Sequence, residues 1–282
     1  MGQTLTYQDD RSLDLLLDKV YRDGGYDFRD YKRSTVVRRL ERRLHTTGSG
    51  TYLDYMQFLD SHPEEYQGLA DALTITVSGF FRSPYAFQQV AKLVLPELVS
   101  HKSRQGKRSL RFWSTACAGG EEPYSIAILL AEFLANRCQD FDISILATDI
   151  SRPALGEAQA GVYSPGRVEP VAFSVLEKYF TRCDQGYAVR TDIKRMLHFS
   201  YFDLTSTTQP PVAELDCVFC CNVLIYLQTW LQEKVLDMLY HSLASPGYLI
   251  LGEAELPTSS LRQQLECLDI KAKIYKKSYA GD

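Results

Sequence analysis

The sequence lacks an apolar run long enough to cross a bilayer. No stretch approaches the roughly 20 residues that a spanning helix needs, and the opening segment MGQTLTYQDD has no apolar signal core. The seven cysteines form no pair of CxxC motifs, so we expect no zinc site and no other metal. An odd number of scattered cysteines in a chain of 282 residues is typical of reduced thiols. We therefore expect a soluble, cytoplasmic protein.

Positive charge is not in excess either. The net charge is −4 at pH 7, which gives no global field for a polyanion. The phosphate-binding patterns GxGxxG and GxxxxGK[ST] are both absent. We therefore expect no nucleic-acid binding, no direct insertion into a membrane, and no dinucleotide or P-loop site.

Two textures follow one another along the chain. From about residue 10 to 90 the apolar residues recur at helical spacing, as in SLDLLLDKVY, TVVRRLERRL and TYLDYMQFLD. From about residue 108 short apolar runs such as LRFWST, ISILATDI, LDCVFCCNV, YLILGEAE and KAKIYKKSY alternate with helical runs. Alternation of this kind predicts an α/β fold, a mainly parallel sheet with helices on both faces.

The alternation also predicts the domain boundaries. We expect an all-helical domain over residues 1–88 and an α/β domain over residues 89–282. Between about residues 162 and 200 the strand–helix alternation lapses, which indicates an inserted subdomain with a helix and short strands.

The turn ACAGGEE follows the run LRFWST and is the first candidate for a ligand site. In an open parallel sheet, ligands bind beyond the carboxyl ends of the strands. Glu121 and Glu122 would repel a phosphate there, so the turn favours a cofactor with a cationic end and no phosphate. S-adenosylmethionine has an ammonium, a sulfonium and ribose hydroxyls. Alternatively, the two acids only complement the dipole of the following helix.

Polar residues stand at three further strand ends. Asp149 is placed to accept hydrogen bonds from ribose hydroxyls, or it is the N-cap of the next helix. Ser151 could serve as that cap and leave Asp149 free. Asp203, Asn222 and Tyr226 follow other apolar runs, and each is either a turn residue or a site residue.

Five segments together resemble the chemotaxis receptor glutamate methyltransferases, the CheR family. They are TITVSGFFRSPYAF, WSTACAGGEEPYSIA, ATDIS, FCCNVLIYL and SPGYLILGEAE. The likeness covers nearly the whole chain, and GEEPYSIA and FFR are specific at this spacing. It implies a class I, Rossmann-like methyltransferase sheet with an inserted β-subdomain and a helical N-terminal domain. It also implies S-adenosylmethionine as cofactor, S-adenosylhomocysteine as product, and glutamate side chains of membrane chemoreceptors as substrate.

The resemblance carries over site residues by motif. The implied cofactor contacts are Thr76, Ser78, Arg82, Glu122, Asp149, Asp203, Leu204, Cys220, Cys221 and Asn222. Arg82 and Tyr226 would line the methyl-transfer site. We expect the guanidinium of Arg82 to orient the substrate carboxylate or to close the site; alternatively it forms only a surface ion pair.

Four positions depart from the family pattern. Thr76 and Asp203 each stand where the family has Asn, and the change at 203 removes an amide donor expected beside adenine. Cys221 replaces an Arg, so a backbone contact survives there and a guanidinium role does not. Glu253 replaces a His. Because the other motif residues are present, we expect an active enzyme.

The run STVVRRLERRL places four arginines opposite an apolar stripe of Val37, Leu40 and Leu44. They are Arg38, Arg39, Arg42 and Arg43. They form a solvated face, or, on the resemblance, they steer the acidic methylation helices in the cytoplasmic part of a receptor. A nucleic-acid role is disfavoured because aromatic interleaving is missing.

The inserted segment bears on the partner. Family members that tether to a receptor's C-terminal pentapeptide carry a GxGxxxG loop, whereas the matching region here, YFTRCDQGYAVRTD, has only Gly186. We therefore predict no dependence on the pentapeptide, and we expect a monomer. Two other functions remain open: a non-catalytic signalling module that binds S-adenosylmethionine, and a methyltransferase that acts on a different protein carboxylate.

Overall fold

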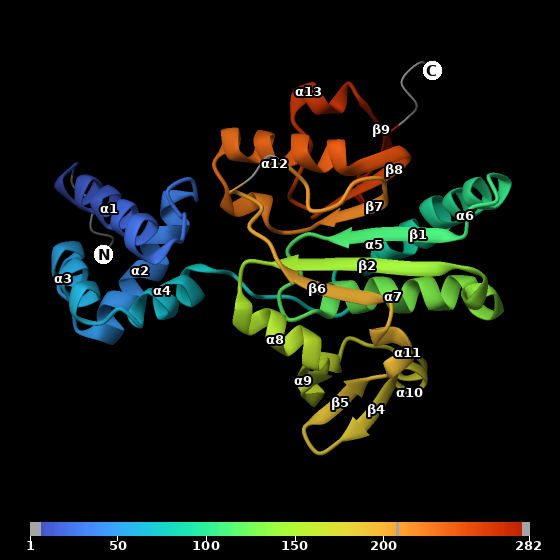
Figure 1. Ribbon diagram of the computed structural model, residues 1–282, viewed down its shortest axis with the longest axis horizontal. Coiled ribbons are helices and arrows are strands. Elements are labelled where there is room, and N and C mark those ends of the chain that lie inside the picture. The colour runs from blue at the N-terminus through green and yellow to red at the C-terminus, as the bar shows by residue number, and fades with distance from the viewer. Residues whose placement is uncertain (1–6, 207–208, 278–282) are drawn as a thin grey trace. The chain divides into compact units, whose positions relative to one another are not determined.

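The computed structural model describes residues 7–206 and 209–277, which fall into two compact units (Figure 1). The smaller unit extends to Ile75 and takes in the segment Tyr226–Leu231. The larger unit comprises Thr76–Ile225 and the chain from Gln232 onward. Within the described ranges, no helix combines the length and the apolar character that crossing a membrane requires.

The smaller unit is helical, as the apolar spacing predicts. Its elements are α1 (Tyr7–Lys19), the π-helical turn η1 (Val20–Gly24), α2 (Arg33–Thr47), α3 (Tyr52–Ser61) and α4 (Glu65–Leu73). Gly48 ends α2 with a left-handed φ of 72°, and the Thr51 side chain caps α3 by accepting the N–H of Asp54 at 3.1 Å. The punctuation HTTGSG thus works as a helix stop followed by a helix start.

The core of the smaller unit draws on all four helices. On α2, Val37 and Leu40 are buried and Leu44 packs against them partly buried. They meet apolar residues of the other helices, such as Leu16 of α1 and Leu59 of α3. The stripe predicted on α2 is therefore the face that the helix turns to its own core.

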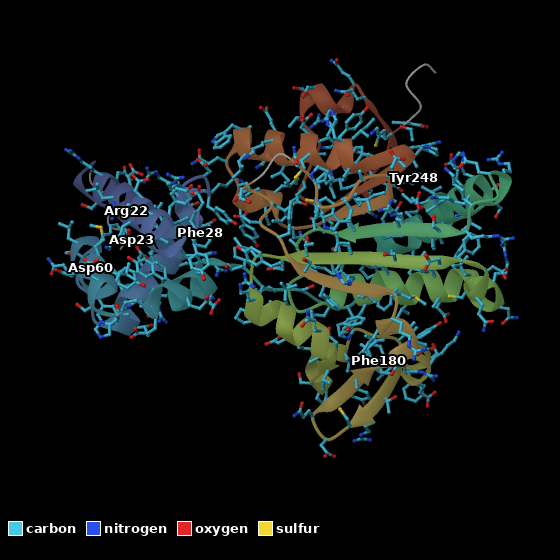
Figure 2. All side chains as sticks on the ribbon, viewed as in Figure 1. Arg22, Asp23, Phe28, Asp60, Phe180 and Tyr248 are labelled. Atoms are coloured by element: carbon cyan, nitrogen blue, oxygen red, sulfur yellow. The ribbon has the colours of Figure 1, made fainter. Side chains whose placement is uncertain are left out.

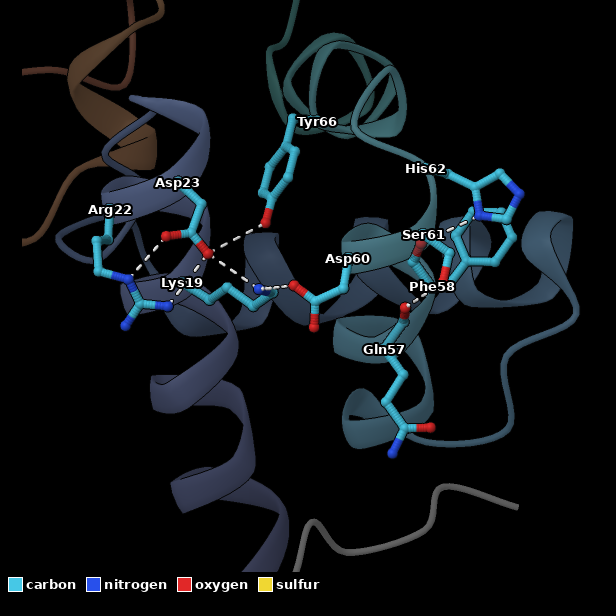
Figure 3. Close-up of polar contacts among 9 residues, drawn as sticks. All are labelled: Lys19, Arg22, Asp23, Gln57, Phe58, Asp60, Ser61, His62 and Tyr66. Atoms are coloured by element: carbon cyan, nitrogen blue, oxygen red, sulfur yellow. Dashed lines mark hydrogen bonds and ion pairs between the residues drawn. The ribbon is translucent and has the colours of Figure 1, made fainter.

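A polar network joins the end of α1 to α3 (Figure 3). The Lys19 ammonium donates to Asp60 and, at 2.9 Å, to Asp23. Arg22 binds the other oxygen of Asp23 at 2.7 Å. These partners raise the pKa of Lys19 and lower the pKa of Asp23. Since Asp60 and Arg22 are exposed, solvent screens the network and its contribution to stability is small.

The larger unit is built on a seven-stranded mixed sheet in the order β6-β2-β1-β7-β8-β10-β9. The strands are β1 (Ser109–Ser114), β2 (Asp142–Asp149), β6 (Leu197–Tyr201), β7 (Leu215–Cys220), β8 (Leu243–Leu251), β9 (Leu265–Asp269) and β10 (Ile274–Lys277). The first five in space are parallel, and β10 runs antiparallel to both of its neighbours. Residues 278 and 279 of the run KAKIYKKSY lie outside the described residues.

Helices lie on both sides of this sheet, which confirms the predicted α/β class (Figure 1). They are α5 (Pro84–Gln89), η2 (Val90–Val94), α6 (Leu95–Arg104), α7 (Glu121–Leu134), η3 (Ala135–Asp140), α8 (Arg152–Ala160), η4 (Leu224–Tyr226), α12 (Thr229–Ser242) and α13 (Ser259–Arg262). Parallel neighbours need such crossovers, because a short turn cannot return the chain to the same end of the sheet.

The core of the larger unit includes aromatic residues that precede its first helix. The Phe80 ring packs edge-on against Tyr163 and Phe180, with centroids 4.9 and 5.4 Å apart. Phe180 and the fully buried Tyr248 are labelled in Figure 2. Because Phe80 and Phe87 are buried here, the larger unit begins at Thr76, and the boundary expected at residues 88 and 89 falls inside it.

The region 162–200 carries a small antiparallel sheet in the order β3-β5-β4. Its elements are β3 (Val162–Tyr163), α9 (Pro165–Val168), α10 (Phe173–Tyr179), β4 (Phe180–Cys183), β5 (Gly186–Val189) and α11 (Thr191–Lys194). Gly186 opens β5 at φ 129°, and a Cβ there would stand 2.2 Å from the carbonyl oxygen of Tyr163. Only glycine fits this close crossing of β3 and β5.

One buried ion pair joins a helix to the sheet. Asp216 lies on β7, whose residues are all buried, and its carboxylate contacts the Lys102 ammonium of α6 at 2.7 Å. The other oxygen accepts the N–H of Arg111 at 2.9 Å. Burial raises the pKa of Asp216, and the bond from Lys102 opposes that shift. The ion pair therefore makes a buried acid tolerable in the middle of the sheet.

We expect Lys102→Met to lower the free energy of unfolding by about 3–5 kcal/mol, because it leaves the buried carboxylate without its cation. Urea titration followed by the fluorescence of the buried Trp113 measures it. Lys107→Met, at an exposed lysine, is the matched control. Lys102→Met/Asp216→Asn should regain most of the loss, since it removes both charges and keeps an acceptor for Arg111. A single variant as stable as the control would contradict this account.

Candidate functional site

The strand order reverses between β1 and β7, and this is the switch point of the sheet. Numbered along the chain, the seven strands stand in the order 3-2-1-4-5-7-6, so β2 and β6 leave β1 on one side and β7 and β8 leave it on the other. The crevice outside the carboxyl ends of β1 and β7 is where such sheets bind ligands. The predicted turn ACAGGEE with Glu122 follows β1, Asp149 ends the neighbouring β2, and Cys220 ends β7 just before Cys221 and Asn222.

The glycine turn after β1 is fastened to the end of β2. The N–H of Ala118 donates to Asp149 at 2.8 Å, and the N–H of Cys117 donates to the carbonyl of Thr148 at 2.9 Å. Gly120 precedes α7 at φ 93°, and a Cβ on it would lie 2.8 Å from the Cβ of Ala158. The turn needs glycine both for this backbone angle and for the close approach of α8.

Glu122 stands in the first turn of α7 and is partly exposed. One of its oxygens accepts the hydroxyl of Ser114 at 2.7 Å. Burial raises the pKa of Glu122 to about 7, although bonds from Ser114 and Cys221 and the positive charge of Arg82 oppose the rise. The structure thus brings residues from the ends of β1 and β7 and from the FFR motif around a single carboxylate.

Glu121, next to it, is turned into the protein and is 1% exposed. The guanidinium of Arg167, from α9 of the inserted region, binds one oxygen with its Nε at 2.8 Å and reaches Glu157 at 3.0 Å. The hydroxyl of Tyr163 in the same region donates to the carbonyl of Gly119 at 2.8 Å. Glu121 therefore ties the glycine turn to the inserted region, a supporting role that differs from that of Glu122.

The FFR motif is held against the start of α7. The Ser125 hydroxyl, which donates to the carbonyl of Glu121 at 2.6 Å, accepts the N–H of Phe81 at 2.9 Å. Phe81 and Ser83 both have positive φ, 50° and 60°, so the backbone turns sharply on either side of Arg82. The exposed Arg82 side chain donates to the carbonyl of Val77 at 3.2 Å. Nearby, Thr76 is exposed and Ser78 is half-buried.

The turn after β7 depends on a distant glutamate. Glu255 is 3% exposed, and its carboxylate accepts backbone N–H groups of Gly252 at 2.8 Å, Asn222 at 2.9 Å and Ile225 at 3.3 Å. Asn222 has φ 61°, a conformation that few residues other than glycine and Asn tolerate. Burial raises the pKa of Glu255, and the three N–H donors oppose it. The Cys220–Cys221–Asn222 turn is thereby fixed.

The cysteines of the site have raised pKa values. Burial raises the pKa of Cys117, Cys220 and Cys221 well above the ordinary value, and the nearby carboxylates raise it further. A thiol that stays protonated at neutral pH is a poor nucleophile. Among residues 7–206 and 209–277, no group of His, Cys, Asp and Glu side chains is arranged to hold a metal ion.

Asp149 and Asp203 have different surroundings. Ser151 is the N-cap of α8, accepting the N–H of Ala154 at 3.3 Å, so Asp149 is not that cap. Asp149 is not free either, because its two oxygens accept the N–H groups of Ala118 and Ser151, each at 2.8 Å. Asp203 lies beyond β6 and accepts both the N–H and the hydroxyl of Thr205. Leu204, which follows Asp203 in the sequence, is buried.

Among the predicted catalytic and cofactor residues, Tyr226 is grouped with the smaller unit, not the larger one. It begins the segment Tyr226–Leu231, which belongs to the smaller unit. Its carbonyl accepts the N–H of Lys32 at 2.8 Å, and Leu227 bridges to Tyr31. Its pairing with Arg82 stays a prediction.

The four arginines of α2 divide into two pairs. Arg38 and Arg42 are exposed. Arg39 donates to the carbonyl of Ala72 at 2.7 Å, near the end of α4. Arg43 forms a bidentate ion pair with the buried Glu65. Only the first pair forms the solvated face that we expected of all four.

Comparison with known proteins shows the family to which this chain belongs. The family described as CheR methyltransferase, SAM binding domain, matches residues 76–274, and its all-alpha domain matches residues 11–74. The chain belongs to the CheR methyltransferase family. The CheR match contains every candidate cofactor residue, from Thr76 to Asn222, and its description supports the use of S-adenosylmethionine.

Named relatives extend over most of this CheR chain. A chemotaxis protein methyltransferase of Borreliella burgdorferi is 29% identical and covers 86% of this chain and 87% of its own. Chemotaxis protein methyltransferase 2 of Pseudomonas aeruginosa is 33% identical and covers 84% of each. An uncharacterised 104.1 kDa protein of Rhodobacter capsulatus is 30% identical over 90% of this chain, which spans only 26% of that longer protein.

Sequence reasoning missed three residues that organise the site. Ser125 belongs to the quoted GEEPYSIA run and Glu255 closes the run SPGYLILGEAE, so motif positions without an assigned role were the available signal. Arg167 of the inserted region carried no signal, because its partner Glu121 is 46 residues away in the chain. Each acts by holding backbone or a neighbouring carboxylate in place.

Glu255→Gln should weaken S-adenosylmethionine binding and lower the free energy of unfolding by about 1–3 kcal/mol. The amide presents one N–H₂ group to a cluster of N–H donors, so at least one buried donor loses its acceptor. Calorimetry and urea titration measure the two effects. Glu253→Gln, two residues earlier and exposed, is the control with the same chemical change. Equal behaviour of the two variants would refute the positioning role.

Proposed function

We propose that this protein transfers the methyl group of S-adenosylmethionine to glutamate side chains of a chemoreceptor, forming glutamate methyl esters and releasing S-adenosylhomocysteine. It would act as a monomer in the cytoplasm, in chemotaxis adaptation or a chemotaxis-like pathway. The family match and the chemotaxis methyltransferase relatives support the general activity. The glutamate substrate rests on the resemblance of the motifs.

The environment of Glu122 carries the proposal. Its partly exposed carboxylate stands at the switch point, and burial holds its pKa near 7. A cationic ligand group would favour the ionised form, whereas a phosphate would repel it. S-adenosylmethionine carries an ammonium and a sulfonium and no phosphate, so its charge fits this carboxylate.

The remaining candidate contacts fit the neutral parts of the same cofactor. The Asp149 oxygens each accept one backbone N–H and keep further lone pairs, so ribose hydroxyls can still donate to them. Leu204 and Cys220 are buried near the neighbouring strand ends, where their backbone groups are proposed to contact the cofactor.

Methyl transfer to a carboxylate asks little of acid–base catalysis. When bound, the sulfonium supplies an electrophilic methyl group, and a glutamate with a usual pKa of about 4.3 is already ionised at neutral pH. The protein's work is then to align the two reactants and to exclude water. This fits a site whose thiols have raised pKa values and which includes an exposed arginine, Arg82.

Arg82 is the residue that we propose orients the substrate carboxylate. Its guanidinium is exposed, yet its backbone is held by the Phe81–Ser125 bond and by two positive φ angles. It also lies close enough to Glu122 to lower that residue's pKa. A planar fork on a fixed backbone suits carboxylate recognition. Tyr226 is retained as the second such residue on the resemblance alone.

The receptor is proposed to meet the enzyme through α2 without a pentapeptide tether. The exposed Arg38 and Arg42 suit the acidic helices that carry target glutamates. In the inserted region β4 and β5 pair Cys183 with Gly186, so the connecting turn leaves no room for a glycine-rich loop. Measurable binding of a free receptor-tail pentapeptide would contradict the tether-free mode.

Arg82→Ala should lower methyl transfer to a receptor cytoplasmic fragment on the order of 10²-fold while the fold is retained. The assay counts base-labile methyl groups, and circular dichroism follows the fold. Arg82→Lys should recover only part of the activity, because it keeps the charge and loses the fork. Arg104→Ala, at an exposed arginine, is the control. Base-labile methylation of wild type separates the enzyme from a non-catalytic module, and its absence would sink the proposed activity.

Arg38→Glu/Arg42→Glu should lower kcat/KM for the receptor fragment about tenfold at low salt and less at high salt, since steering by exposed charges is screened. Arg11→Glu/Arg22→Glu makes the same charge change at exposed positions of the same unit, away from α2 in the chain. Arg39 and Arg43 are unsuitable for this test because they hold Ala72 and Glu65. If the control pair lowers kcat/KM equally, the loss is a general effect of net charge, and specific steering by Arg38 and Arg42 is contradicted.

A further inference from the structure

The larger unit carries a surface groove near the end of the sheet where β10 and β9 lie. Two hollows of about 350 and 360 Å³ adjoin there and share Ile270 and Lys273. The first is bounded by Tyr85, Lys271 and Glu253, and the second by Leu256 and Arg262, among others. We name the two together the edge groove.

The edge groove exposes apolar side chains that a folded protein usually covers. Ile270 is 61% exposed, Leu256 43% and Tyr85 37%. Apolar residues that gather along a groove are typical of protein-binding surfaces, unlike single exposed residues. Tyr85 belongs to α5, Leu256 follows β8, and Ile270 lies between β9 and β10. The patch therefore forms only when these distant parts of the chain fold together.

The groove is built on a rigid frame. Asp269 accepts the N–H groups of Lys271 and Ala272 at 2.9 and 2.8 Å and the hydroxyl of Tyr85 at 3.0 Å. The ammonium of Lys271 lies 4.5 Å from the centre of the Tyr85 ring. These bonds join the β9–β10 turn to the start of α5. A preformed surface of this kind loses little conformational entropy when a partner binds.

The charges of the groove favour an acidic partner. Lys271, Lys273 and Arg262 line it, against a single lining carboxylate, Glu253. The Asp269 carboxylate beneath the turn keeps its charge while it accepts the Tyr85 hydroxyl and backbone N–H groups, so the three cations stand against two carboxylates in all. An amphipathic segment with apolar residues on one side and carboxylates on the other would match both the apolar and the cationic lining.

The groove adjoins the candidate site. Ser83, which follows Arg82, lines the first hollow. Glu253, on the same lining, follows Gly252, whose N–H is held by Glu255 together with that of Asn222. A segment seated in the groove would therefore pass beside the residue that we propose orients the substrate carboxylate.

We propose that the edge groove docks an acidic amphipathic segment of the substrate receptor, adjacent to the glutamate that is methylated. The inference rests on the proposed function and deepens it, because the methyltransferase unit itself then holds the substrate, in addition to any steering by α2. The groove selects the segment by an apolar contact at Ile270 and by the charges of Lys271 and Lys273.

The test compares two variants with one control on a receptor cytoplasmic fragment. Lys271→Glu/Lys273→Glu and, separately, Ile270→Ser should each raise KM for the fragment about tenfold. The affinity for S-adenosylmethionine and kcat at saturating fragment should stay unchanged. Arg104→Glu/Lys107→Glu makes the same charge change at exposed residues that precede β1, and it should leave KM unaltered.

The outcomes separate the groove from the activity. In one outcome the wild type binds a fluorescent fragment, both variants bind it more weakly, and the wild type forms no methyl ester. This would support the groove and refute the proposed methyl transfer. Methyl transfer with an unchanged KM in both variants would overturn the groove alone. A wild-type dimer in sedimentation that Ile270→Ser dissociates, or binding to anionic vesicles that the double variant loses, with KM unchanged, would assign the groove to another partner and overturn the proposal.

Discussion

Two buried carboxylates, Asp149 and Glu255, hold the loops that follow the central strands, and the rest of the candidate site depends on them. Asp149 fixes the glycine turn after β1, and Glu255 fixes the turn after β7. Each accepts backbone N–H groups that would otherwise be buried without a partner, a situation that costs about 1–3 kcal/mol per group. Parallel strands bring these loops to one edge, but only the carboxylates give them a fixed shape.

Backbone hydrogen bonds stabilise these two acids against the cost of burial. Burial raises the pKa of both, and backbone donors lower it. Among the described residues, Glu122 receives no backbone donor, only one hydroxyl and one thiol, and burial raises its pKa to about 7. The site therefore contains two carboxylates that hold the loops through backbone N–H groups, and a third, Glu122, whose negative charge a cationic ligand group can neutralise. This difference fits the proposed role of Glu122 as the acid that contacts the cofactor.

Periodicity and motif order were enough to predict the α/β class and the helical first part. The same pattern indicates the strand ends at which we expect the site. Periodicity and motif order could not predict partners that are distant in the chain. Asp216 lies within an apolar strand, and nothing in its neighbours indicates that Lys102 of another element neutralises it. For the same reason Arg39 and Arg43 resembled their exposed neighbours, since a helical pattern shows which face is polar and leaves open which polar residues pack on α4.

The division of labour between Glu121 and Glu122 follows from helix geometry together with the inserted region. Consecutive residues at a helix start point about 100° apart, so the two cannot face the same surroundings. Glu121 is directed to Arg167 of the inserted region, whereas Glu122 faces Ser114 at the end of β1. An insertion far from the strand ends in sequence thus buttresses the glycine turn. It leaves Glu122 directed to the end of β1, which fits the proposal that this carboxylate lies beside a phosphate-free cofactor.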